Sequence, residues 1–471
     1  MFPATMADAM KRVLAGIFLL ALSAAGVYGY TLSERERSYR QLIADGDAAL
    51  ARDNTSAAIE AFSGAITLKT ESMLGYLKRG QTYRRRGEFV AAIRDLRRAA
   101  EIDPTATRPL EELGDAYLAD TPHRYSAAAG RYQEYVKLDN RAPRVLYKLG
   151  FARYSEGDAA GAIDALQHAI ALDPRAAEAF YLLGLCHRAA QHFDAARVAL
   201  ESALVLQPVL LHAREELADL NGVLGRADAR IAQLEILSAL DPGPSREVTL
   251  GLAYARAAQS DRAVLTLGRA AERYPDYPYA YVALGRVWLE IAQARSDRVA
   301  LSKALGALEG AVGSDDSSEA FMLFGRALLM TADEETAERM LQDATERRPV
   351  EPLAFYYLAE AAERLGHFSI ARDALLDYDV LRGDEVDDRR RSAHMTRLGD
   401  LSLRLNEPAV AATYFLRASG QGDAALLARA ADAQLRAGDP DAARATAIKA
   451  LEKDPTNTLA LSVQRRAGPR I

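Results

Sequence analysis

The sequence predicts an all-α protein built as a stack of helical hairpins. Two observations support this prediction. Seven prolines, at positions 104, 174, 208, 242, 275, 349 and 455, are separated by one, two or three steps of about 34 residues. A shared pattern of apolar residues, glycine and alanine returns around them. One hairpin of this length cannot bury its apolar stripe alone, so neighbouring hairpins must pack against it.

Each unit contains two helices with distinct patterns. The first helix carries a large apolar residue, then Leu-Gly, then usually an aromatic residue, as in PYAYVALGRVW (278–288), TRPLEELGDAY (107–117) and AEAFYLLGLCH (177–187). The second helix carries a small residue, a leucine or aromatic residue and an alanine, as at Ala162, Leu166 and Ala169. Apolar residues three and four apart form one stripe on each helix, and the proline that follows ends the second helix.

This pattern resembles the tetratricopeptide repeat family, whose unit of about 34 residues forms a helix-turn-helix. The resemblance implies a right-handed superhelical solenoid, in which the first helices line the concave face. We expect about twelve repeats, starting near residues 39, 73, 107, 143, 177, 211, 244, 278, 318, 352, 392 and 424. Repeats 1–10 would occupy 39–382 and repeats 11–12 would occupy 392–457, separated by a charged linker at 383–391. A capping helix and tail would follow at 458–471.

The amino-terminal segment has a different composition. A short leader (1–12) ends in Lys11 and Arg12, and an uncharged stretch follows at 13–32. Its apolar core at 13–30 is just long enough to cross a bilayer, which predicts an uncleaved transmembrane signal anchor. A cleaved signal peptide, with Ser23-Ala24-Ala25 as its small-residue site, and a buried helix remain alternatives.

The leader also bears on the compartment. A short basic leader before a long body usually leads to export of that body, so we expect a single-pass protein of the bacterial inner membrane with a periplasmic body. Basic residues also follow the apolar stretch, at Arg35, Arg37 and Arg40. A cytoplasmic body therefore remains an alternative.

Composition and motif searches argue against catalysis. The formal net charge of −6 argues against non-specific nucleic-acid binding, and Cys186, the only cysteine, excludes both an intramolecular disulfide and a multi-cysteine metal site. The chain lacks a phosphate loop, a His-Glu-x-x-His motif and a Gly-x-Ser-x-Gly motif. The segment 420–425 matches a dinucleotide fingerprint in letters, but it lies at a turn between repeats. We therefore expect no catalytic residue, no cofactor, no metal ion and no enzymatic activity.

The resemblance also implies a binding groove. In the family, residues one after the large apolar position, and one, four and five after the glycine, tend to point into the concave face. Here these positions include Arg84, Arg85, Tyr147, Phe151, Tyr154, Tyr181, Leu185, Arg188, Val282, Arg286, Tyr356, Glu360 and Glu363. Tyrosines flanked by arginines suit an extended peptide, because rings supply contact area and guanidinium groups pair with carboxylates. The alternative is that the tyrosines pack between neighbouring first helices.

These features predict a membrane-tethered, non-catalytic scaffold that binds partner proteins or extended peptides, in an envelope assembly or export complex. One alternative is a polysaccharide-binding or export scaffold, because the same tyrosines can stack on sugar rings. A second alternative is an accessory subunit of an enzyme complex. The second unit is also locally basic, from Lys78 to Arg98. This run can contact anionic headgroups or an acidic partner, or it can be a solvated helix surface.

Overall fold

The computed structural model describes residues 4–382, 388–420 and 422–468, and these residues form 25 α-helices and no β-strand. The predicted all-α fold is confirmed. The chain divides into two compact units, residues 1–233 and residues 234–471, with the boundary inside α12 (Ala227–Leu240). Each unit is described separately below.

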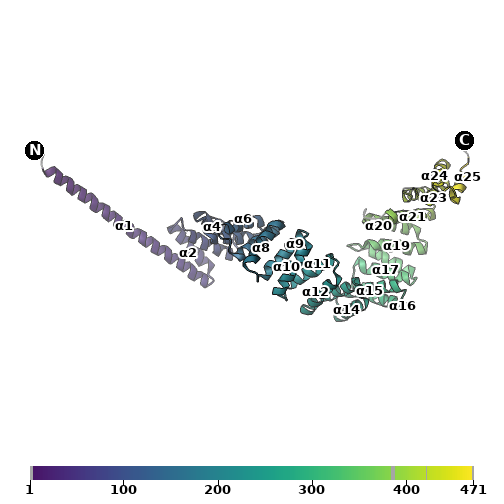
Figure 1. Ribbon diagram of the computed structural model, residues 1–471, viewed down its shortest axis with the longest axis horizontal. Helices are drawn as coiled ribbons and strands as arrows, with labels where there is room; N and C mark the ends of the chain where they lie inside the picture. Colours follow the sequence, from purple (N-terminus) through teal and green to yellow (C-terminus); the bar gives the residue numbers. More distant parts are fainter. Residues whose placement is uncertain (1–3, 383–387, 421, 469–471) are drawn as a thin grey trace. The chain divides into compact units, whose positions relative to one another are not determined.

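Unit 1 contains the helices α1 (Ala4–Ala51), α2 (Thr55–Leu68), α3 (Met73–Arg85), α4 (Phe89–Ile102), α5 (Thr107–Ala119), α6 (Tyr125–Leu138), α7 (Pro143–Glu156), α8 (Ala159–Leu172), α9 (Ala177–Ala189), α10 (Phe193–Leu206) and α11 (Leu211–Val223) (Figure 1). Unit 2 contains the helices α13 (Pro244–Arg256), α14 (Ser260–Arg273), α15 (Tyr279–Arg295), α16 (Arg298–Val312), α17 (Ser318–Met330), α18 (Glu334–Glu346), α19 (Pro352–Leu365), α20 (Phe368–Arg382), α21 (Asp388–Arg404), α22 (Pro408–Ala418), α23 (Ala424–Arg436), α24 (Pro440–Lys453) and α25 (Thr458–Arg466).

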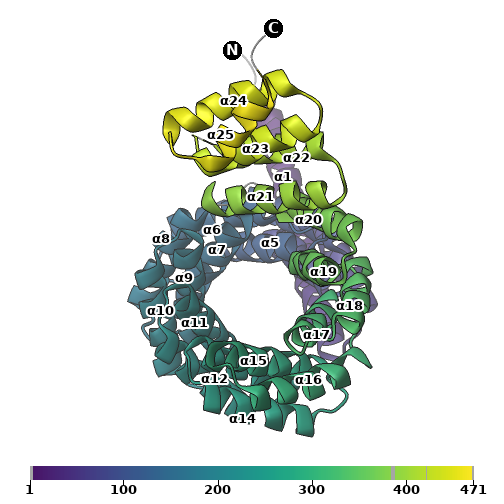
Figure 2. The same ribbon diagram turned by 90° about the vertical axis from the view of Figure 1, so that its right-hand side faces the viewer.

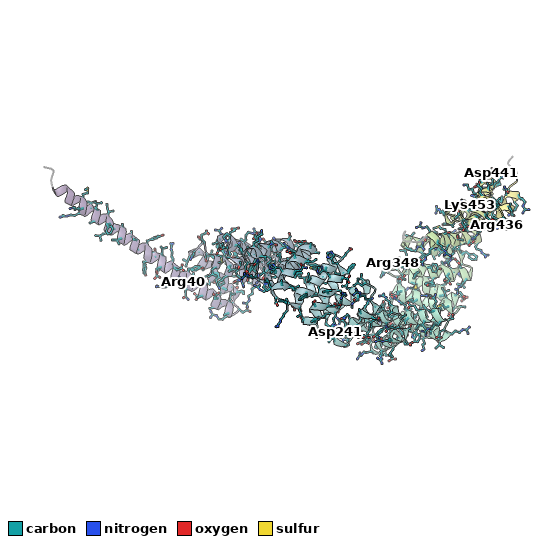
Figure 3. All side chains as sticks on the ribbon, viewed as in Figure 1. Arg40, Asp241, Arg348, Arg436, Asp441 and Lys453 are labelled. Carbon is teal, nitrogen blue, oxygen red and sulfur yellow. The ribbon has the colours of Figure 1, made fainter. Side chains whose placement is uncertain are left out.

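Successive helices pair as hairpins, and the two members of each hairpin form separate layers. In unit 2, the first helices α15, α17 and α19 form one layer and the second helices α14, α16 and α18 form the other (Figure 2). Exposed charged side chains cover the helix surfaces, as Arg436, Asp441 and Lys453 illustrate (Figure 3). This arrangement is the expected stack of helix-turn-helix repeats.

The first helices begin close to the starts expected from the repeat. Nine first helices begin at the expected residue: α3, α5, α7, α9, α11, α13, α17, α19 and α23. Helix α15 begins at 279 instead of 278. The eleventh first helix, α21, begins at Asp388 instead of 392, so residues 388–391 of the expected charged linker are helical. The remainder of that linker, 383–387, lies outside the described residues.

A close contact on a glycine of the first helix joins the two helices of most hairpins. A Cβ built on Gly114 would lie 2.5 Å from the ring of Tyr132, and one built on Gly150 would lie 2.6 Å from Cγ of Leu166. The same contact joins Gly80 to Leu96, Gly184 to Leu200, Gly251 to Leu267, Gly285 to Leu308, Gly325 to Leu341 and Gly399 to Phe415. The glycine therefore leaves room for the large side chain of the second helix, as the sequence pattern predicts.

An aspartate makes the turn between several repeats. Asp103, Asp139, Asp173 and Asp454 each cap the end of a second helix, and each side chain accepts a hydrogen bond of 2.9–3.0 Å from the backbone N–H two residues later. This is an Asx turn. The Thr105 hydroxyl also donates to Asp103 and lowers the pKa of that carboxyl. The aspartate thus acts together with the proline that often follows it.

α1 combines two different segments in one helix of 48 residues. Its apolar amino-terminal part is exposed, with Val13, Phe18 and Leu20 each more than half accessible. Its carboxy-terminal part serves as the first helix of repeat 1, where Tyr39 and Ile43 are buried in one apolar cluster with residues of α2. The hydroxyls of Tyr39 and Ser72, the cap of α3, are 2.6 Å apart.

The described part of α1 from Met10 to Ala51 is long and apolar enough to cross a membrane, judged by length and composition. A signal sequence near the amino terminus has the same properties. None of its most apolar stretch is buried against the rest of the protein. The alternative of a buried helix is therefore wrong for this segment.

The carboxy-terminal helix covers the last repeat of unit 2. Ala460 and Val463 of α25 are fully buried in a cluster with residues of α23 and α24. Arg444 in α24 donates from Nε to the carbonyl oxygen of Gly468 at 3.0 Å. The end of the stack thus has its apolar side covered.

Two glycines of one hairpin test the close contact. Gly114→Ala is expected to lower the free energy of unfolding by about 1–3 kcal/mol, because the new Cβ overlaps the Tyr132 ring. Gly130→Ala is expected to raise it by about 0.5–1 kcal/mol, because Gly130 is helical and has no atom within 4 Å of its Cβ position. Denaturation followed by circular dichroism compares the two variants. Equal effects of the two changes would contradict the role assigned to Gly114.

Candidate functional site

The residues predicted to line the groove lie on first helices of both units. Arg84 and Arg85 lie at the end of α3, Tyr147, Phe151 and Tyr154 on α7, Tyr181, Leu185 and Arg188 on α9, Arg286 on α15 and Tyr356 on α19. Val282 on α15 is fully buried, so it belongs to the core. The first-helix face is defined here as the exposed side of the first helices of one unit.

All four predicted groove arginines pair with carboxylates of neighbouring hairpins. Arg84 Nη2 lies 2.8 Å from Glu112 Oε2, and Arg85 Nη2 lies 2.7 Å from Asp53 Oδ1. Arg188 pairs with Glu216, and Arg286 pairs with Glu319. These guanidinium groups are therefore held by carboxylates of the chain itself.

The ion pairs between first helices follow a rule of register. A cation two residues before the glycine of one first helix bonds to the aspartate one residue after the glycine of the preceding first helix. Lys78 Nζ lies 2.7 Å from Asp47 Oδ1, and Lys148 Nζ lies 2.7 Å from Asp115 Oδ1. In unit 2, Arg429 pairs with Asp400 in the same way, although the helix of Arg429 has Ala431 at the glycine position.

A second kind of ion pair runs in the opposite direction, from a cation of one first helix to a carboxylate of the following first helix. Its cation stands at the predicted groove position four residues after the glycine. Arg84 reaches Glu112, which stands two residues before the next glycine. The predicted groove residues did not include this facing position, which Glu112 occupies. Opposite charges at these two positions of successive repeats are the signal that identifies the pairs.

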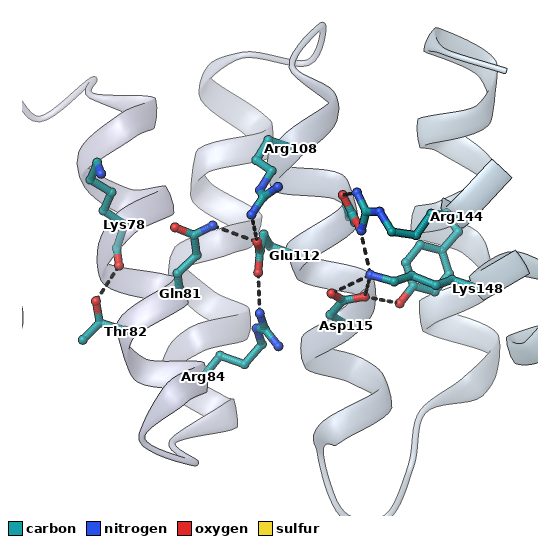
Figure 4. A network of polar contacts seen from close by, with 11 residues as sticks. Lys78, Gln81, Thr82, Arg84, Arg108, Glu112, Asp115, Arg144 and Lys148 are labelled. Carbon is teal, nitrogen blue, oxygen red and sulfur yellow. Dashed lines mark hydrogen bonds and ion pairs between the residues drawn. The ribbon is translucent and has the colours of Figure 1, made fainter. Parts of the chain in front are cut away.

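Glu112 lies at the centre of a buried polar network in unit 1 (Figure 4). Its side chain is 5% exposed, and it accepts hydrogen bonds of 2.8 Å from Gln81 Nε2 and Arg84 Nη2. Arg108 Nη2, one turn earlier on α5, lies 2.8 Å from the same carboxylate. Buried carboxylates need partners of this kind, since an unpaired buried charge is costly.

Two further carboxylates of α5 face α7. Lys148 Nζ donates to Glu111 Oε1 at 2.8 Å and to Asp115 at 2.7 and 2.8 Å (Figure 4). Arg144 also pairs with Glu111, and the Tyr132 hydroxyl donates to Asp115 at 2.6 Å. Burial, and then the bond to Asp115, raise the pKa of Tyr132. The network thus joins α3, α5 and α7 through charge.

Four of the predicted groove residues of unit 1 pack against apolar clusters. Tyr147, Tyr154 and Leu185 pack against a cluster formed by α8, α9 and α10, whereas Tyr181 packs against the next cluster. Burial raises the pKa of Tyr147, as does the nearby Glu178 carboxylate. These contacts match the alternative in which tyrosines pack between neighbouring hairpins, although each tyrosine is only partly buried.

Phe151 is more accessible than the tyrosines. It is 38% exposed, and its ring meets Tyr125 of α6 edge-on at a centroid distance of 6.4 Å. The structure therefore does not bring Phe151 into the cluster of Tyr147.

A pocket of about 360 Å³ opens beside Tyr147. It lies where α7 begins, α8 ends and α9 begins, and Pro143, Ala176 and Ala179 form part of its lining. Arg144 and Glu178 contribute charged groups. The pocket is large enough for one apolar side chain of a ligand, and its charged lining residues are Arg144, Asp173 and Glu178.

In unit 2, Tyr356 lies within an aromatic and cationic cluster. Its ring centroid lies 5.5 Å from that of Tyr357 and 5.6 Å from that of Tyr378. The Arg397 guanidinium lies 5.2 Å from the Tyr356 centroid and donates from Nε to Glu363 at 2.6 Å. Tyr356 thus joins α19 to α20 and α21.

The histidines, the cysteine and the carboxylates of the described residues do not gather into a metal site. No group of three or more His, Cys, Asp or Glu side chains among these residues has the geometry of a metal site. Burial raises the pKa of the Cys186 thiol to about 12, which keeps this group protonated and weakly nucleophilic at neutral pH. Burial and the neighbouring His192 lower the pKa of His187.

Comparison with known families agrees with this architecture. A tetratricopeptide repeat family model matches residues 43–107, 112–174, 147–209, 322–385 and 393–458, and a second tetratricopeptide repeat model matches residues 248–277. These matches cover more than half of the chain. The chain belongs to the tetratricopeptide repeat family, whose members generally act as non-catalytic scaffolds that bind proteins or peptides.

Individual relatives are similar over limited regions. The small glutamine-rich tetratricopeptide repeat-containing protein 2 of Mycosarcoma maydis is 33% identical over 99 residues, which are 21% of this chain and 28% of that protein. A crystal structure of MamA protein is 27% identical over 36% of this chain and 93% of that chain, with a TM-score of 0.35. YrrB, described as having an unusual peptide-binding site, is 19% identical over 39% of this chain and 94% of its own, with a TM-score of 0.36.

Two lysines at the same repeat position test the polar network. Lys148→Met is expected to lower the free energy of unfolding by about 2–3 kcal/mol, because Glu111, whose side chain is 4% exposed, loses one of its two cations. Lys78→Met is expected to cost less than about 1 kcal/mol, because its partner Asp47 is 47% exposed. Chemical denaturation measures both. Similar costs would show that burial of the α5 carboxylates does not set the strength of the network.

Proposed function

We propose that the chain is a membrane-tethered, non-catalytic scaffold that binds an extended peptide of a partner protein along the first-helix face of unit 1. The observation that carries this proposal is the pocket beside Tyr147. It combines apolar lining from Pro143 and Ala176 with charged groups from Arg144 and Glu178. A peptide can place one apolar side chain in such a pocket while its neighbouring polar groups meet the charged groups.

The buried network of α5 supports this assignment by fixing the helices that carry the pocket. Arg144 and Lys148 of α7 are bonded to the carboxylates of α5, so α7 is held in place before a ligand arrives. A preformed site loses less conformational entropy on binding than a flexible one. The pocket therefore provides an anchoring point on an ordered surface.

The proposed tether is the amino-terminal half of α1. Its exposed apolar side chains have no partner among the described residues of the protein, and a bilayer supplies one. We assign the chain to the bacterial inner membrane, with the repeats in the periplasm as part of an envelope assembly or export complex. The short basic leader before the apolar stretch supports this orientation.

A pocket-filling variant tests peptide binding. Ala176→Phe places a ring in the pocket and is expected to weaken binding of the best ligand from a random peptide library about tenfold, since one buried apolar side chain of the ligand is lost. Ala106→Phe is the matched control, because Ala106 caps α5 as Ala176 caps α9 and lies outside this pocket. The wild-type chain and both variants, each in nanodiscs, are titrated with the selected peptide.

Two results would reject the peptide proposal. One is an equal loss of affinity for both variants. The other is selection of oligosaccharides instead of peptides in a parallel screen, with an affinity that salt does not change.

A charge in the apolar segment tests the tether. Leu20→Arg places a charge near the middle of the proposed span at a cost of about 3 kcal/mol, so a larger fraction of the protein is expected in the soluble fraction after carbonate extraction. Val205→Arg makes the same change at an exposed site of α10 and is expected to leave the protein in the membrane pellet. Protease treatment of intact cells and of spheroplasts then shows on which side of the membrane the repeats lie. A wild-type chain released by carbonate would refute the tether.

A further inference from the structure

Two adjoining open pockets lie on the second-helix side of unit 1. The first, of about 630 Å³, lies among α4, α5 and α6 and includes Leu110, Arg131 and Lys137. The second, also of about 630 Å³, lies over α3 and α4 and includes Tyr76 and Arg94. Arg97 and Glu101 of α4 line both pockets, so the pockets form one continuous surface, called here the α4–α6 surface.

Positive charge predominates on the α4–α6 surface. Its cations are Arg79, Arg94, Arg97, Arg98, Arg124, Arg131 and Lys137, and its carboxylates are Asp95, Glu101 and Glu134. The lining thus has seven cations and three carboxylates, and two of the cations pair with carboxylates outside it, Arg98 with Glu71 and Arg124 with Asp120. The formal net charge of the chain is −6. This surface is therefore charged oppositely to the protein as a whole.

Several of these cations are poorly compensated within the chain. Arg97 donates from Nη2 to the Tyr117 hydroxyl at 3.0 Å, and it forms no salt bridge with a described residue, although the Glu101 carboxylate interacts with its charge at longer range. Arg94 is 72% exposed and lies 3.7 Å from Asp95, which Arg79 already holds by hydrogen bonds of 2.5 and 3.0 Å. Lys137 forms no ion pair with any described residue. An anionic ligand can pair with these groups without breaking a bond between a cation and its carboxylate.

A pocket of the same construction in unit 2 has balanced charge. It has a volume of about 620 Å³, lies over α13 and α14, and is lined by Arg269 and Arg273 together with Glu247 and Glu272. The spacing between second helices therefore produces such pockets in both units, whereas the excess of cations belongs to the α4–α6 surface. The repeat architecture alone does not explain that excess.

The lining of the α4–α6 surface indicates the kind of anion. Leu110 and Leu113 contribute apolar lining to the first pocket, and Ile93 and Val90, which is 76% exposed, contribute it to the second. A free phosphate or a lipid headgroup has no apolar part to place there. A peptide that combines acidic with apolar side chains matches both the charge and the lining.

We propose that the α4–α6 surface is a second binding site, which takes an acidic segment of a partner protein that also carries apolar side chains. The cations proposed to bind the segment lie on the second helices α4 and α6, whereas α3 and α5 contribute part of the lining. Carboxylates of the segment pair with Arg94, Arg97 and Lys137, and its apolar side chains enter the two pockets. The chain would then hold two partner segments on opposite helix layers of unit 1.

The test titrates the full chain, in nanodiscs of zwitterionic lipid, with a fluorescent peptide of alternating acidic and apolar residues. The double variant R97E/K137E is expected to weaken binding at least about tenfold at low salt, because two attractive contacts become repulsive. The milder variant R97Q/K137Q is expected to show an intermediate loss. The control R269E/K449E changes the net charge equally on exposed second-helix positions of unit 2 and is expected to change affinity less than about twofold.

Several outcomes would overturn the proposal. One is that the acidic peptide binds no more tightly than an analogue with Gln and Asn in place of Glu and Asp, which would show that charge has no role. An equal loss in the control would assign binding to net charge rather than to this surface. Loss of wild-type peptide binding when the nanodiscs contain anionic lipid would assign the surface to headgroups. Circular dichroism of each variant shows whether its helices remain intact, and R97Q/K137Q carries the test if R97E/K137E does not fold.

Discussion

The contact between a glycine of most first helices and a large side chain of the paired second helix is the constraint on which much of the structure depends. Where Tyr132 covers Gly114 or Leu166 covers Gly150, the two helix backbones come close enough for the alanines beside them to be fully buried. The hairpin then presents a flat apolar side to the next hairpin, and stacking follows from the need to bury that side. The sites described for unit 1 lie on hairpins that contain this contact.

Much of the fold could be predicted from the sequence, because the repeat records local requirements. Pro143 and Ala177 begin first helices at the residues that the period indicates, and Gly184 faces Leu200 as the spacing of the pattern implies. The site could be predicted only in part. The pairing of Arg84 with Glu112 depends on how far one first helix is rotated relative to the next, which is a tertiary property and is absent from the pattern of a single repeat. The early start of α21 was not predicted for a different reason. Its first turn is so rich in charged residues that its composition resembles that of a linker.

Charged side chains are paired differently in the two helix layers of unit 1. On the first helices, Glu111, Glu112 and Asp115 are matched by cations from the adjacent hairpins, and their charges mainly hold helices together. On the second helices, Arg97 and Lys137 are exposed and lack such carboxylates among the described residues. Paired charges contribute order, whereas uncompensated charges provide attraction for a ligand and make binding depend on salt. This difference distinguishes the carboxylates that hold first helices together from the cations of the proposed second binding site.

The continuity of α1 has a mechanical consequence. A flexible linker between an anchor and its cargo would allow the cargo to tumble, but the helix from Ala4 to Ala51 has no break at which rotation can be absorbed. Tyr39 is packed into repeat 1, and its hydroxyl meets that of Ser72 at the start of α3. The apolar half of α1 is therefore joined to the first repeat by continuous helix, without a loop between them.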